Sequence, residues 1–235
     1  MESHNLELDD IQSRLRFDYQ VVSLMNSPLM GVQAFRDVDD LKARHNPITN
    51  IDEGHLATHY RVDYHLRTLV NAGEYSRLTT VHFDLFANNN YPLTEPSCFV
   101  IETPMPWSPH FWAGYPICIG DIWEQGEGTM LLGQLFVHIA KLLNFDEPAH
   151  TPGYEGYNGE AIEYWETTLN RQPITPGLIY PKLPDLVYAP LPTAVPVRPL
   201  FARKSVIGAP PPLIRRRVIA GTPDSSAKIT IRRSQ

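Results

Sequence analysis

A cysteine in a proline-containing loop is the residue best suited to covalent chemistry in this chain. Cys118 lies in residues 108–121, which also hold two prolines and three aromatic residues. A thiolate is a strong nucleophile and a good leaving group, so an accessible cysteine can take up an acyl group as a thioester and pass it on. The other cysteine, Cys98, lies in the apolar run 98–101, and we expect it to be a core residue.

His110 is the second candidate catalytic residue. It ends the triplet Ser108-Pro109-His110 and precedes Cys118 by eight residues. An imidazole N–H can stabilise a developing oxyanion, and a neutral ring can take a proton from an attacking amine. A structural role in holding the loop is an equally good interpretation of His110. Three tryptophans are expected to pack this loop rather than to contact a ligand: Trp107, Trp112 and Trp123.

The residue types also allow two other kinds of site, which the spacing does not favour. A cysteine hydrolase would pair Cys118 with His110 or His138, but no third residue that would orient the histidine is indicated. His55 and His59 could face one side of a helix, yet the order His-Glu-x-x-His is absent. We therefore do not expect a metal ion.

The segments before the loop must provide the scaffold that positions it. Apolar residues recur at steps of three and four from Leu8, which predicts an amphipathic helix that runs to about Asn26. A second, shorter helical pattern follows. Its apolar residues are Val32, Phe35, Val38 and Leu41.

The apolar period then changes from that of a helix to that of a strand. Residues 59–69 and 75–87 alternate between apolar and polar side chains, and residues 71–74 form a turn signal between them. This pattern predicts an antiparallel hairpin. Residues 98–101 are the third predicted strand.

Two helices are predicted after the cysteine loop. The chain should stay irregular through residues 126–128, with Thr129 as the N-cap of an amphipathic helix that ends at Asn144. Residues 157–170 carry the last helical pattern. The order of elements predicts the α+β class, with helices flanking one antiparallel meander sheet.

Composition divides the chain into an acidic body and a basic tail. The chain has 235 residues, of which 43% are hydrophobic, enough for a domain of about 150 residues and an additional segment. Residues 1–170 hold 9 of the 20 basic and 24 of the 26 acidic residues, whereas residues 171–235 hold 12 of the 22 prolines and a net charge of +9. Such a tail is expected to be extended or bound to an acidic partner, which could be nucleic acid, a protein or the body itself.

Cysteine content and hydropathy bear on the compartment. Two cysteines do not make a disulfide framework, which favours a reducing environment. The first residues are acidic and lack the charged and apolar regions of a signal peptide, and no apolar run reaches the length of a membrane span. We expect a cytoplasmic protein without a membrane partner.

Several motifs, taken in chain order, carry a resemblance to a known family. The residues are Tyr91-Pro92 with Pro96, Gly114 with Ile117-Cys118, Trp123, and the helix register of residues 161–164. Together with the first helix and the meander, they resemble ubiquitin-conjugating enzymes over residues 5–170. His110 stands where that family has the asparagine of its His-Pro-Asn motif, a change that resembles divergent bacterial members.

The resemblance implies both a fold and an activity. It implies a ubiquitin-conjugating-enzyme-like domain at 5–170, followed by the Pro-rich tail at 171–235. Cys118 would accept a ubiquitin-like protein from an adenylating activating enzyme and transfer it to an amine or thiol, without a cofactor of its own. Bacterial proteins of this kind resemble parts of antiviral defence systems. The alternative is a catalytically weakened scaffold that binds the same partners. Candidates for an acidic gate that orients the acceptor are Asp146, Glu147 and Glu155.

Overall fold

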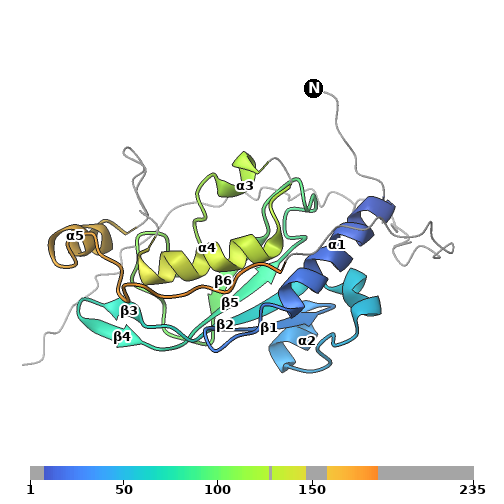
Figure 1. Cartoon of the computed structure of the whole chain (residues 1–235), viewed down its shortest axis with the longest axis horizontal. Coiled ribbons are helices and arrows are strands. Elements are labelled where there is room, and N and C mark those ends of the chain that lie inside the picture. Colours follow the sequence, from blue (N-terminus) through green and yellow to red (C-terminus); the bar gives the residue numbers. More distant parts are fainter. Residues whose placement is uncertain (1–7, 127–128, 147–157, 185–235) are drawn as a thin grey trace, which may run out of the picture. The chain divides into compact units, whose positions relative to one another are not determined.

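The fold is α+β, with one four-stranded antiparallel sheet and helices packed against it (Figure 1). The computed structural model describes residues 8–126, 129–146 and 158–184. The helices are α1 (Leu8–Ser23), α2 (Val38–Ala43), the 3-10 helix η1 (Ile51–Leu56), α3 (Ile122–Gln125), α4 (Leu132–Asn144) and α5 (Gly159–Thr167). The strands are β1 (Met30–Phe35), β2 (His59–Tyr64), β3 (Thr68–Asn71), β4 (Glu74–Ser76), β5 (Thr79–Asp84) and β6 (Ser97–Ile101).

The sheet has the order β1-β2-β5-β6, and each neighbouring pair is antiparallel. The hairpin predicted from the alternating pattern is confirmed by the pairing of β2 with β5, in which Val62 lies opposite Val81. The predicted turn joins β3 to β4, which form a separate two-stranded sheet at the far end of the same hairpin. The third predicted strand is β6.

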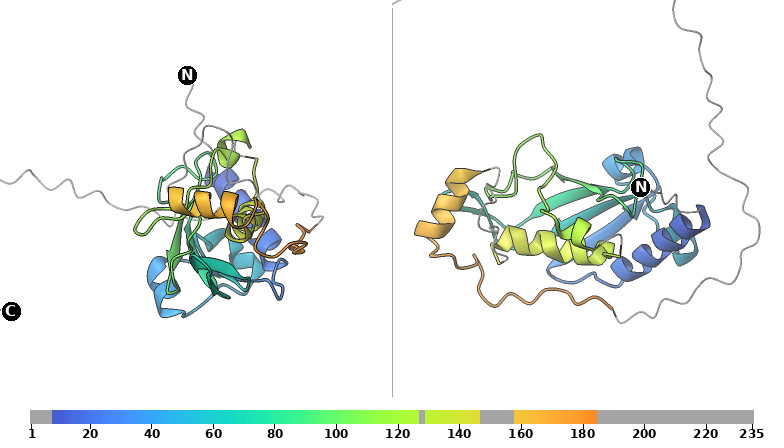
Figure 2. Two further views of the ribbon diagram at one scale, coloured as in Figure 1. Left: turned by 90° about the vertical axis from the view of Figure 1, so that its left-hand side faces the viewer. Right: turned by 90° about the horizontal axis from the view of Figure 1, so that it is seen from above.

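The main core lies between the sheet and the helices α1 and α4 (Figures 1 and 2). Alternate residues of β2 and β5 point to this core, where Tyr60 and Phe83 contact the ring of Phe136 from α4. The Tyr64 hydroxyl donates to the Phe136 carbonyl at 3.1 Å. The helical stripe predicted for α4 is therefore its buried face, and the helix ends at Asn144 as predicted.

Two local predictions are wrong, each because contacts distant in sequence decide the structure. The residues predicted as a second helix form β1 followed by the short helix α2, because residues 30–35 pair with β2 and Asp37 then caps α2. Helix α4 begins at Leu132, with Leu131 rather than Thr129 at the N-cap. The N–H of Leu131 donates to the Gln134 side chain, and the N–H of Leu132 donates to the carboxylate of Asp18 in α1.

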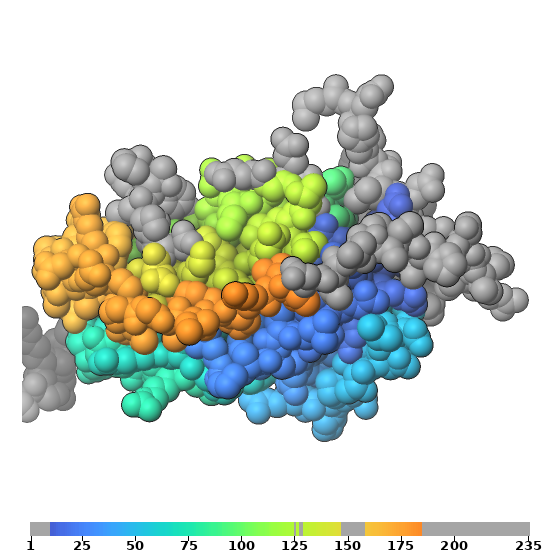
Figure 3. Space-filling model, viewed as in Figure 1, coloured from blue at the N-terminus to red at the C-terminus, as the bar shows by residue number. Residues whose placement is uncertain are grey.

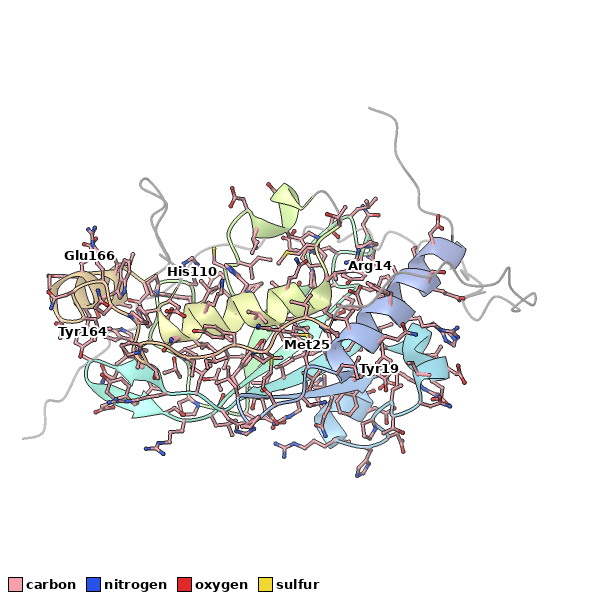
Figure 4. All side chains as sticks on the ribbon, in the orientation of Figure 1. Arg14, Tyr19, Met25, His110, Tyr164 and Glu166 are labelled. Atoms are coloured by element: carbon pink, nitrogen blue, oxygen red, sulfur yellow. The ribbon has the colours of Figure 1, made fainter. Side chains whose placement is uncertain are left out.

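Asp18 joins three elements at the start of α4. Its buried carboxylate accepts from Arg14 at 2.6 Å, from the Tyr91 hydroxyl at 2.5 Å and from the N–H of Leu132 at 3.1 Å. Burial raises the pKa of Asp18, while Arg14 and the hydrogen bonds oppose that shift by favouring the charged form. Figure 4 shows Arg14 on α1, near the first turn of α4.

A smaller cluster holds the other end of α4. Leu69 of β3, Phe145 and Trp165 of α5 are its buried members. The ring of Tyr164 packs edge to face against Trp107, which brings α5 to the loop that follows β6. This cluster attaches the β3–β4 hairpin and α5 to the rest of the fold.

Residues 171–184 run along the body without forming a helix or strand. Asn144 holds the beginning of this segment. Its side chain accepts from the N–H of Thr175 and donates to the Thr175 carbonyl and the Tyr180 hydroxyl. Farther along, Leu178 and Leu183 pack against the main core. Figure 3 shows the segment as an orange band leading away from α5. Within the described residues, no helix is long and apolar enough to cross a membrane.

Candidate functional site

The candidate site is the loop that connects β6 to α3 (Figure 2). Backbone hydrogen bonds fix this loop on both sides of Cys118. The N–H of Ile117 donates to the Cys98 carbonyl of β6 at 2.7 Å, and the N–H of Cys118 donates to the His110 carbonyl at 3.0 Å. Because one of these bonds leads to the sheet, the conformation of the loop is tied to the scaffold.

The side chain of His110 makes a second hydrogen bond with Cys118. Its Nδ1 lies 2.9 Å from the Cys118 carbonyl oxygen. A carbonyl only accepts, so Nδ1 carries the proton, and a neutral ring then has Nε2 as an acceptor. The two residues are thus joined by a reciprocal pair of hydrogen bonds, which we call the His110–Cys118 clasp. Figure 4 shows His110 above α4, in the loop that leads to α3.

The two cysteines lie in different environments. Cys98 is 1% exposed, its thiol donates to the Pro96 carbonyl, and burial raises its pKa far above the ordinary value. The prediction that Cys98 is a core residue is confirmed. Cys118 is partly exposed and lies between the buried residues Ile117 and Ile119, close in sequence to the exposed residues 112–116. Of the two thiols, that of Cys118 is the one accessible to another molecule.

The three tryptophans near the loop do not share one role. Trp123 of α3 is buried and its indole N–H donates to the Pro92 carbonyl at 3.0 Å, so it holds α3 on the loop after β5. Trp107 packs against Tyr164. Trp112, however, is 48% exposed, and the prediction that it packs the loop is wrong. Its neighbour Phe111 is buried instead and belongs to the main core.

Tyr91 positions the loop indirectly. Its ring packs against Trp123, and its hydroxyl donates to Asp18. The Tyr91–Pro92 peptide bond is cis. Sequence patterns indicated the Tyr-Pro pair but not the buried carboxylate that it contacts, since Asp18 lies 73 residues away.

Among the described contacts, none joins the other candidate histidines to Cys118. His55 is a surface residue that contacts the Asp52 carbonyl, and His59 contacts His82 at 3.1 Å on the sheet. His138 lies on α4. Among the described residues, no group of three His, Cys, Asp or Glu side chains is arranged to hold a metal ion.

The acidic gate candidates are only partly within the described structure. Asp146 is exposed and follows Phe145, the C-cap of α4. Glu147 and Glu155 lie outside the described residues. The structure therefore gives a position for one of the three candidates.

No protein-family model matches the chain. A search of curated proteins also gives no significant match.

Proposed function

We propose that this protein is a transferase of the ubiquitin-conjugating type, which carries a ubiquitin-like protein as a thioester on Cys118. The observation that supports it best is the His110–Cys118 clasp, which presents a partly exposed thiol on a surface loop while the second thiol stays buried. A carrier needs such a rigid, accessible sulfur. The order of a first helix, an antiparallel meander, a cysteine loop and later helices also agrees with a ubiquitin-conjugating-enzyme-like fold.

Loading is an exchange between two thioesters. The thiolate of Cys118 attacks the carbonyl carbon of the thioester that an adenylating activating enzyme holds on its own cysteine. A new C–S bond forms, the old C–S bond breaks, and the activating enzyme's thiolate leaves. The ATP is consumed by the activating enzyme, so this chain needs no cofactor for the step.

Transfer to the acceptor then breaks the thioester on Cys118. A neutral amine, or a thiolate, of the acceptor attacks the same carbonyl carbon. The C–N or C–S bond to the acceptor forms, the bond to Cys118 breaks, and the thiolate of Cys118 leaves. In aminolysis the amine nitrogen loses a proton to solvent or to a nearby base.

His110 contributes to both steps as a positioning residue in this proposal. Its Nδ1–H donates to the Cys118 carbonyl, so that proton is not available to an oxyanion on the thioester. The hydrogen bond fixes the backbone at the reacting residue instead. Preorganisation of this kind matters because a misplacement of about 1 Å can cost about 100-fold in rate.

The proposal is tested by thioester formation. We expect the protein, incubated with its activating enzyme, ATP and the ubiquitin-like protein, to form an adduct that a thiol reductant removes. The substitution Cys118→Ala should abolish the adduct because the sulfur is the only atom to which the acyl group is joined. Denaturing electrophoresis with and without reductant measures it.

The matched control is Cys98→Ala, which removes the other sulfur. It should leave the adduct intact, because Cys98 is buried. Absence of an adduct on the wild-type protein would reject thioester transfer. If the unmodified protein still bound the ubiquitin-like protein or the activating enzyme, the catalytically weakened scaffold would be the better account.

A further inference from the structure

We propose that the surface beside Cys118 binds an acceptor segment carrying a second cationic side chain near the amine that is modified. The surface consists of the exposed rings of Trp112 and Tyr115 together with the carboxylates that follow Cys118. This inference rests on the proposed function and specifies its acceptor.

The aromatic rings are unusually accessible for their size. Trp112 is 48% exposed and Tyr115 is 60% exposed. The N–H of Tyr115 donates to the Trp112 carbonyl at 3.2 Å, which closes a turn and holds the two residues near each other. Large rings that remain in water add nothing to the core, and such rings are frequent anchors of protein partners.

Both rings lie within reach of the reacting sulfur. Tyr115 is three residues from Cys118, so their Cα atoms are at most about 11 Å apart. Trp112 is two residues from His110, and the clasp brings His110 to Cys118. A peptide that contacts the rings can therefore place a neighbouring side chain at the thioester.

The charge of this region favours a cation. From residue 78 to residue 140 the sequence has no lysine or arginine, and of its six acidic residues Glu102 is already paired with Arg44 and Arg61. Two of the others, Asp121 at the end of the cysteine loop and Glu124 in α3, follow Cys118 by three and six residues and are exposed. A cationic side chain is attracted to the face of an exposed indole or phenol ring, and nearby carboxylates add to that attraction.

The protein that binds this surface is the acceptor and not the carried ubiquitin-like protein. The carried protein is held by a covalent bond to Cys118 during transfer. The acceptor has no such bond and must be captured by noncovalent contacts. Its attacking amine must be neutral, so the cation that the rings recognise is a different side chain of the same segment.

The test compares two acceptor peptides on a preloaded protein. Cys118 is loaded by exchange with a synthetic Gly-Gly-terminated peptide thioester, which requires no activating enzyme. The acetylated acceptors are Ala-Ala-Lys-Ala-Arg and the same peptide with citrulline in place of arginine. We expect the arginine peptide to discharge the thioester about threefold faster at low concentration, the size of one exposed cation–π contact.

Substitutions of the rings assign the preference to them. In Trp112→Ala and Tyr115→Ala the ratio of the two rates should approach one, while Trp112→Phe should keep part of it. Leu24→Ala is the matched control, because Leu24 is an equally exposed apolar residue at the end of α1. An unchanged ratio in both alanine variants would overturn the inference.

A binding measurement keeps the inference testable if Cys118 does not load. The arginine peptide should shift the NMR signals of the Trp112 and Tyr115 rings in the unloaded protein, and the citrulline peptide should shift them less. Equal shifts, or none, would reject the cation site. Loading without ring shifts would leave the proposed function standing and remove the inference alone.

Discussion

His110 is held by its clasp to Cys118, and this fixes what its ring can do. Nδ1 donates to the Cys118 carbonyl, and the residue is 5% exposed. An asparagine at the same position could donate an amide N–H to the same carbonyl, because both side chains offer a donor near the backbone. A histidine can therefore hold this loop as an asparagine would, without a direct contact to an oxyanion.

We predict that His110→Ala lowers both the loading and the discharge of Cys118 by about 10-fold, whereas His110→Asn restores most of the activity. Alanine leaves the Cys118 carbonyl without its side-chain donor. Rates at several pH values separate positioning from proton transfer. A positioning role gives parallel pH profiles for the wild type and the asparagine variant. An inflection near pH 6.5 that only the wild type shows would instead identify His110 as a base.

Sequence patterns single out the cysteine loop as the candidate site, but they do not tell which of its side chains are buried. Burial of Cys98 follows from its apolar strand, and the structure confirms it. The exposure of Trp112 could not be foreseen, because Phe111 and Trp112 are equally apolar and the chain there has no regular period. Which of the two rings turns inward is decided by the core that the loop covers.

At the scale of elements, β1 shows where local patterns fail. Val32 and Phe35 are three residues apart, which imitates a helix, yet residues 30–35 are a strand paired with β2. The longer alternations of β2 and β5 predict strands, and their pairing confirms them, because six alternating residues leave few other interpretations. The start of α4 could not be predicted from Thr129 alone, because the first N–H groups bind Gln134 within the helix and Asp18 in α1.

The sheet contains a titratable contact between strands. His59 of β2 and His82 of β5 are 3.1 Å apart, with Asp84 and Asp37 near His59 and Lys42 near His82. Burial, with a contribution from His59, lowers the pKa of His82 to about 4. Burial also lowers the pKa of His59, against the effect of Asp84.

We predict that the contribution of these two neutral histidines to the stability of the fold decreases as the pH falls. Unfolded histidines titrate near 6.5, so below that pH the unfolded chain binds more protons than the folded one. The contribution is complete above about pH 6.5 and is lost as the pH approaches 4. Urea midpoints between pH 7.5 and 4.5 measure it. His82→Gln should flatten the dependence, and His65→Gln, at an exposed histidine, should not. Parallel curves for wild type and His82→Gln would contradict the prediction.

At the scale of the whole molecule, the body extends beyond the last helix. Asn144 is buried and binds Thr175 and Tyr180, and Leu178 and Leu183 pack against the main core. The change in charge and proline content near residue 170 is visible in the sequence. Such a change in composition indicates where helices and strands end. It does not indicate that the extended segment after them still packs against the body.

We predict that a chain ending at residue 170 is less stable to urea than one ending at residue 184. The shorter chain loses the bonds to Asn144 and the apolar contacts of the segment, together worth roughly 2–5 kcal/mol. Asn144→Ala in the full chain is the matched comparison, since it removes the side-chain bonds and keeps the segment. Equal midpoints for the two shortened chains would show that residues 171–184 add nothing to stability.

The contrast between the two sulfurs has a practical consequence. Because the thiol of Cys98 is buried in the core and Cys118 is partly exposed, an alkylating reagent should modify the native protein once and the denatured protein twice. The mass of the product would then count the folded fraction in any sample. The same selectivity would permit a fluorophore to be attached at the loop without altering the interior.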